Sequence, residues 1–146
     1  MKIDYQRQPP GSSLCGQTCV AMIAGVPLEE SISRFNSKGG TRTKQVKQVL
    51  ESFGFNATNR LKRVTKGTII PSLAIGKMRW SNSNHSHWVV IYDGKIYDPD
   101  PITTPPIRKV RKQEFAGSPR ITSYLEIKRA KPRRKRKTKN LSMATN

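Results

Sequence analysis

The hydrophobic and polar positions divide this chain into a helical first part and a strand-rich second part. A helix is predicted to begin near Cys15 or Gly16, and from Thr18 to Ala24 the residues are small or apolar on nearly every side, which is typical of a buried helix. Apolar residues at helical spacing predict two further helices, over Leu28–Phe35 and Thr43–Phe53. Beyond them, short apolar alternations predict strands over Arg60–Val64, Thr68–Ile75, His87–Tyr92, Lys95–Tyr97 and Ile121–Ile127. Helices followed by strands indicate an α+β domain, with the helical half packed on an antiparallel sheet.

A tight hairpin is predicted at Asp93-Gly94, which separates two alternating apolar runs. With these two residues as the turn, His87 faces Asp100 and Val89 faces Asp98. Because side chains alternate along a strand, His87 then shares one face of the hairpin with both carboxylates. Asp100 is directly opposite and Asp98 diagonal, so either one is within reach of the imidazole.

The length of 146 residues suits one domain with one hydrophobic core. We assign residues 1–127 to this domain. Residues 128–146 lack apolar periodicity and are expected to form a basic, disordered tail. No apolar run is long enough to span a bilayer, and the first residues lack the apolar block of a secretory signal. The expected location is therefore the cytoplasm of a bacterium or an infected host, and a phage origin with virion association is an alternative.

The net charge of +19 comes from 28 Lys and Arg against 9 Asp and Glu. Such a field attracts polyanions through phosphate contacts and counterion release. We therefore predict DNA or RNA contact through the tail, which has no acidic residue; a solvated charge run without a partner is the alternative. The basic residues of the tail are Lys128, Arg129, Lys131, Arg133, Arg134, Lys135, Arg136, Lys137 and Lys139.

The two cysteines occupy successive turns of the first predicted helix. A disulfide between Cys15 and Cys19 would constrain almost nothing, so free thiols in a reducing compartment are expected. Cys15 lies at the start of the helix, where the helix dipole favours a thiolate. His87 and Asp98 supply a base and an orienting carboxylate, so the three side chains predict nucleophilic catalysis.

Several motifs together resemble the double-glycine, bacteriocin-leader type of papain-like cysteine peptidase and its stand-alone relatives. They are Gln8, Cys15-Gly16-Gln17-Thr18-Cys19, His87-Trp88-Val89-Val90 and Asp98-Pro99. The resemblance implies a papain-like fold and hydrolysis of a peptide or isopeptide bond, without cofactor or metal. It implies Cys15 as nucleophile, His87 as base and Asp98 as the residue that orients the imidazole. Gln8 and the backbone N–H of Cys15 would stabilise the oxyanion.

The oxyanion donor has alternatives, because Gln8 precedes Cys15 by one residue more than is usual in that family. Gln6 and Gln17 are the other glutamines near the nucleophile. The loop at residues 11–13 is able to absorb the extra residue and keep Gln8 in place.

Other interpretations of the cysteines and histidines also remain open. Cys19 is a second candidate nucleophile, although a small core residue is the simpler interpretation. His85 is a second candidate base, in a polar loop. A zinc site made of Cys15, Cys19, His85 and His87 is conceivable, but the spacing matches no standard structural zinc module.

Two alternative functions follow from the same features. The first is a catalytically silent papain-like fold that binds DNA, RNA or a ribonucleoprotein through its basic residues. The second is acyl transfer, since an amine is able to intercept an acyl-thioester in place of water. A peptide or protein substrate is expected for the enzyme, and no membrane contact is expected for either alternative.

Overall fold

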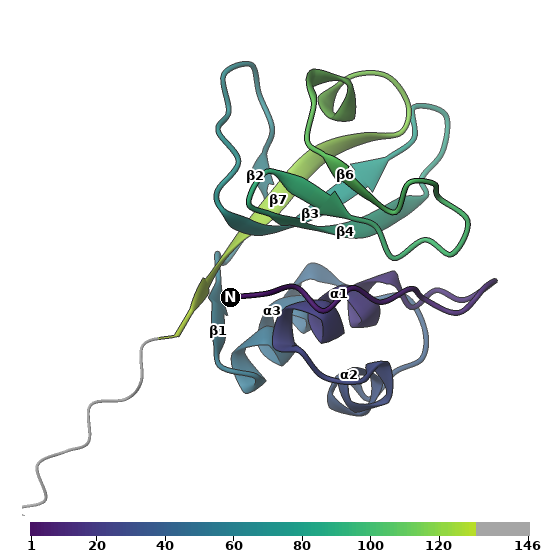
Figure 1. Ribbon diagram of the computed structural model, residues 1–146, viewed down its shortest axis with the longest axis vertical. Helices are drawn as coiled ribbons and strands as arrows, with labels where there is room; N and C mark the ends of the chain where they lie inside the picture. Colours follow the sequence, from purple (N-terminus) through teal and green to yellow (C-terminus); the bar gives the residue numbers. More distant parts are fainter. Residues whose placement is uncertain (131–146) are drawn as a thin grey trace, which may run out of the picture.

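The computed structural model describes residues 1–130, which form a layer of three helices and an antiparallel sheet of seven strands (Figure 1). The helices are α1 (Cys15–Ala24), α2 (Leu28–Phe35) and α3 (Thr43–Ser52). The strands are β1 (Phe55–Ala57), β2 (Lys62–Arg63), β3 (Leu73–Arg79), β4 (Ser86–Tyr92), β5 (Lys95–Tyr97), β6 (Ile107–Lys109) and β7 (Arg120–Arg129), with a 3₁₀ turn, η1 (Lys112–Phe115), before β7. The predicted α+β class is confirmed.

The sheet has the order β1-β7-β3-β4-β5-β6, and β2 pairs with β7 at Ser123 and Tyr124. The β4–β5 hairpin has the register that its turn predicts, with Val90 opposite Tyr97 and Ile91 opposite Ile96. Asp93 and Gly94 both have positive φ angles, 50° and 75°, as a two-residue turn of this kind requires. This register places the start of β4 beside the residues that follow β5.

The core lies between α1 and one face of the sheet. Every residue of α1 from Gly16 to Ile23 is buried, because α2 and α3 cover the side of the helix that faces away from the sheet. Trp88 and Val90 of β4 point toward α1, whereas Val89 and Ile91 point to the opposite face. There a second, smaller cluster includes Ala74, Met78, Val89, Ile91, Ile96, Ile121 and Tyr124.

Some strand predictions were wrong in position or extent. The strand predicted over Thr68–Ile75 begins only at Leu73 and continues to Arg79. Residues before it lack a pairing partner, and Ile69 is exposed, whereas Gly76 to Arg79 pair on both sides with β4 and β7. The strand predicted over Arg60–Val64 contracts to β2. β1 and β6 were not predicted, because each is short and is defined by its pairing with a neighbouring strand.

β7 extends beyond residue 127, where the domain was predicted to end. Arg129 pairs with Phe55 and Lys128 with Asn56, so both basic residues belong to the sheet. The other seven basic residues of the predicted tail lie outside the described residues. Within residues 1–130, no helix is long and apolar enough to cross a membrane.

Candidate active site

Cys15 is the first residue of α1, at the end of the helix where backbone N–H groups point outward. Leu14 precedes it without a side-chain cap, and the first turn contains no acidic residue. Gly16 allows the neighbouring loop to approach closely, since a Cβ there would lie 2.2 Å from Thr41 Oγ1. The start of α1 is therefore electropositive and closely packed on one side.

His87 and Asp98 form a buried pair beside this helix start. His87 Nε2 lies 2.7 Å from Asp98 Oδ1, and Asp98 is only 2% exposed. Of the two carboxylates predicted to share a face with the histidine, the diagonal one makes this contact. Asp100 instead donates its backbone N–H to Asp98 Oδ1 at 3.0 Å. Since Asp98 engages Nε2, Nδ1 is the ring nitrogen left for Cys15, which lines the same cleft as His87.

These contacts favour an ion pair between Cys15 and His87. Burial by itself raises the pKa of the Cys15 thiol, but hydrogen bonds from His87, Trp88 N–H and Gly16 N–H, together with the His87 charge, lower the pKa overall. Burial lowers the pKa of His87, but Asp98 and Cys15 outweigh it and raise the pKa to about 9. A thiolate beside an imidazolium is the state that these shifts support.

Asp98 is held as a carboxylate by several donors. Burial would raise its pKa, whereas His87, the Asp100 N–H and the nearby Arg108 charge lower its pKa overall. Arg108 Nη1 lies 3.3 Å from Asp98 Oδ2, and Arg108 Nε lies 3.4 Å from Glu114 Oε1. Sequence reasoning missed Arg108, because its position opposite Ile96 depends on β6, which was not predicted.

Of the three glutamines considered, Gln8 lies in the cleft with Cys15. Its backbone N–H donates to Pro99 O at 2.8 Å, and Nε2 donates to Ser12 O at 3.0 Å. Gln6 instead donates to Val26 O, and Gln17 is buried and holds the loop after α2 through Gly39 O. Gln6 and Gln17 therefore point away from the position of an oxyanion.

The cleft has a volume of about 310 Å³ and brings Gln8, Cys15 and His87 together. Asp98 lies behind His87 and does not line the cleft. The lining residues are Gln8, Ser12, Ser13, Cys15, Gly40, Thr41, Asn84, His85, Ser86, His87 and Trp88.

The alternative residues have other surroundings. Cys19 is fully buried, and burial raises the pKa of its thiol well above the ordinary value. His85 is exposed at the rim of the cleft, with its ring centroid 5.2 Å from that of Trp80. Within residues 1–130, no three His, Cys, Asp or Glu side chains gather as a metal site, so the four proposed zinc ligands do not form one.

Comparison with known proteins gives similarity in structure. No family model matches the chain, and no curated protein sequence matches it. A double-glycine motif protease from an AMS/PCAT transporter, solved in complex with the leader peptide, is similar with a TM-score of 0.59 and 21% identity over 88% of this chain and 94% of that one. The peptidase domain of Streptococcus ComA, a bifunctional ABC transporter involved in a quorum-sensing pathway, is similar with a TM-score of 0.57 and 14% identity. This similarity covers 89% of this chain and 98% of that one.

The chain has the papain-like fold of double-glycine peptidase domains. Nearly the whole length of both peptidase structures is covered, so the fold that the motifs imply is confirmed. In this fold the helix start, the β4–β5 hairpin and the N-terminal segment meet at one cleft.

Proposed function

We propose that the protein is a thiol-dependent hydrolase that cleaves a peptide or isopeptide bond with Cys15, His87 and Asp98. The observation that carries this proposal is the buried imidazole of His87, which contacts Asp98 at 2.7 Å and lines one cleft with Cys15, whose pKa it lowers. The similarity to peptidase domains supports the reaction class. The leader peptide bound to one of them supports a polypeptide substrate.

The first half of the reaction forms an acyl-enzyme. The Cys15 thiol gives its proton to Nδ1 of His87, and the thiolate attacks the carbonyl carbon of the scissile bond. His87 then gives a proton to the leaving amine as the carbon–nitrogen bond breaks. Asp98 holds the ring orientation and stabilises the imidazolium throughout.

The oxyanion forms beside two donors. The backbone N–H of Cys15 and a hydrogen of Gln8 Nε2 that is not used by Ser12 stabilise the negative charge, each contributing about 3 to 4 kcal/mol. Gln8 Oε1 and Thr41 Oγ1 are buried and have no hydrogen-bond partner among the described residues. Their side chains belong to residues that line the cleft beside Cys15, so the wall of the cleft is polar there.

The second half of the reaction releases the acyl group. Water gives a proton to His87 and attacks the thioester carbonyl, and the thiolate of Cys15 leaves. An amine acceptor in place of water would give transfer rather than hydrolysis. A reactive thiolate persists in reducing surroundings, and we propose the cytoplasm as its location.

The test is selective alkylation of the purified protein with iodoacetamide near pH 7, with adducts mapped by mass spectrometry. Cys15 should react at least about a hundred times faster than Cys19, since only its thiolate is stabilised and accessible. His87→Ala should slow the Cys15 reaction by about tenfold or more, and His85→Ala serves as the matched control. Equal, slow labelling of both cysteines would contradict the proposal and leave a silent fold with a binding role.

A further inference from the structure

A row of cationic side chains borders the proposed catalytic cleft. Across β7, β3 and β4, Arg120 pairs with Arg79, and Arg79 pairs with Ser86, which lines the cleft. Paired residues of antiparallel strands have side chains on the same face. The two arginines therefore lie on the same side of the sheet as Ser86. Since neighbouring strands are about 4.8 Å apart, both arginines lie within about 10 Å of Ser86.

Both arginines line a second pocket, of about 650 Å³. Arg63, Arg79 and Arg120 line it, together with Phe115 and the hydroxyl residues Thr122 and Ser123, and no acidic residue is present in its lining. Within residues 1–130, none of the three arginines makes an ion pair or a side-chain hydrogen bond. Three unpaired guanidinium groups around one pocket indicate a site for an anionic ligand.

A lysine extends this cationic cluster to the wall of the cleft. Lys77 Nζ lies 5.5 Å from the ring centre of Trp88, which lines the cleft. Burial lowers the pKa of Lys77, and the charge of Arg79 lowers it further. Lys77 pairs with Ser123, which lines the pocket, and with Trp88, so it lies between the pocket and the cleft.

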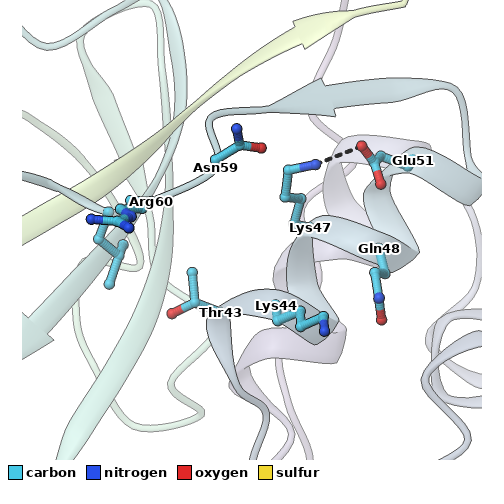
Figure 2. A pocket seen from close by; sticks show the side chains of 8 residues that line it. Thr43, Lys44, Lys47, Gln48, Glu51, Asn59 and Arg60 are labelled. Atoms are coloured by element: carbon cyan, nitrogen blue, oxygen red, sulfur yellow. Dashed lines mark hydrogen bonds and ion pairs between the residues drawn. The ribbon is translucent and has the colours of Figure 1, made fainter.

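Another pocket of similar size differs in its charge balance. The pocket beside α3, of about 580 Å³, contains Lys44, Lys47 and Arg60, but it also contains Glu51 (Figure 2). Lys47 and Glu51 are joined at 2.7 Å, as the dashed line in Figure 2 shows. In that pocket Glu51 therefore neutralises the charge of Lys47. The lining of the three-arginine pocket contains no carboxylate, so only a carboxylate of a ligand is able to pair with its arginines.

We propose that the three-arginine pocket binds acidic side chains of the polypeptide substrate, about three to five residues from the scissile bond. This inference rests on the proposed function. An extended peptide advances about 3.3 Å per residue, so a chain held at Cys15 reaches the arginines within a few residues. Guanidinium groups match carboxylates in bidentate geometry. The cationic row is short and ends at Trp88, which suits a few carboxylates of a peptide in the cleft better than a continuing polynucleotide.

The test uses two peptides, acetyl-Glu₆-Gly₂-amide and its Gln₆ counterpart, as protectants of Cys15 against iodoacetamide in the full chain. In the unaltered protein the Glu peptide should halve the labelling rate at a concentration about tenfold lower than the Gln peptide. Arg79→Gln with Arg120→Gln should bring the two concentrations together. Lys95→Gln with Lys109→Gln is the matched control, since these exposed lysines also face each other across neighbouring strands.

The outcomes separate this inference from the proposed function. Selective Cys15 labelling with equal protection by both peptides overturns the acidic pocket and leaves the peptidase proposal intact. Without selective labelling, fluorescence anisotropy of a labelled Glu₆ peptide still reports on the pocket. An oligo-dT of equal charge that binds as tightly, with the same loss in the double variant, would show a nucleic-acid site and overturn the inference. Thermal melts establish that the variants fold, and Arg63→Gln gives a second, independent loss of binding.

Discussion

Cys15 and Cys19 lie one helical turn apart in α1, yet their surroundings favour opposite protonation states. The first turn faces the cleft, where Cys15 meets His87 and the N–H of Trp88. The second turn faces the core, where Cys19 has no exposed surface. Burial raises the pKa of both thiols, and only at Cys15 do partners outweigh it.

The difference shows that the sulfur itself does not determine its chemistry. Helix position supplies the exposed N–H groups, and the β4–β5 hairpin supplies the imidazole and the carboxylate. One turn of helix moves a thiol by about 5.4 Å, which is enough to exchange these partners for apolar side chains. Altering each cysteine and each partner in turn is therefore the direct way to break or sharpen the comparison.

The largest effect is expected from Cys15→Ala, which should remove turnover completely and leave folding intact. Cys19→Ala should retain the rapid labelling of Cys15 but lower the free energy of unfolding by about 1 kcal/mol, since it leaves a small cavity in the core. Mass spectrometry of alkylated protein and urea unfolding measure the two outcomes. Loss of activity in the Cys19 variant, with normal folding, would exchange the roles of the two thiols.

Asp98→Asn should have the next largest effect. The amide still contacts the ring but no longer stabilises the imidazolium, so turnover should fall by about 10² to 10⁴. The rate of acyl-enzyme formation on a peptide substrate measures this fall. Asp100→Asn is the control, because the Asp100 side chain does not contact His87, and a similar loss in both variants would argue against a specific role for Asp98.

Gly16→Ala should destabilise the protein by about 1 to 3 kcal/mol through overpacking, because its Cβ would lie 2.2 Å from Thr41 Oγ1. Displacement of Thr41 should also slow alkylation of Cys15. Gly40→Ala is the matched control in the same loop, since a Cβ there meets nothing within 4 Å. The free energy of unfolding of both variants is measured with urea. Equal losses in the two variants would refute this packing.

The pH dependence should separate the two cysteines by the direction of their pKa shifts. Alkylation of Cys15 should rise to its half-maximum below the ordinary thiol pKa of 9.0, and that of Cys19 above it. Turnover should fall at low pH as Cys15 takes up a proton, and at high pH as His87 loses its proton near 9. Stopped-flow alkylation from pH 5 to 10 measures the pH dependence of the two cysteines. Coincident curves for both thiols would contradict the opposite directions of their pKa shifts.

Arg108→Gln should give the smallest effect. Loss of the guanidinium charge should raise the pKa of Asp98 toward its usual range and also raise the pKa of the nearby Cys15 thiol, so the low-pH limb of turnover should move to higher pH by less than about one unit. Glu114→Gln should leave the limb nearly in place, since Glu114 contacts Arg108 and not Asp98. A pH–rate profile that is identical in Arg108→Gln and the unaltered protein would exclude this positioning role.

The sequence predicted most successfully what local signals determine. The bounds of α2 follow from apolar spacing behind Pro27, and the Asp93-Gly94 turn sets the register that brings His87 beside Asp98. The proximity of Cys15 to His87 followed from the motifs and the resemblance that they carry.

What escaped prediction depends on partners far along the chain. β1 becomes a strand by pairing with β7, and β3 extends past Gly76 because strands lie on both sides. Arg108 lies beside Asp98 only because β6 pairs with β5. The choice among three glutamines likewise needed the three-dimensional path of residues 1–13.

The N-terminal segment joins the parts of the cleft by hydrogen bonds to residues remote in sequence. Tyr5 donates its hydroxyl to Asp98 O at 2.7 Å, and Gln8 N–H donates to Pro99 O at 2.8 Å. A nascent chain that lacks these long-range contacts carries two ordinary thiols. The Cys15 thiol therefore becomes a strong nucleophile only when the tertiary structure is complete. Rapid alkylation of Cys15 is then also a measure of complete folding.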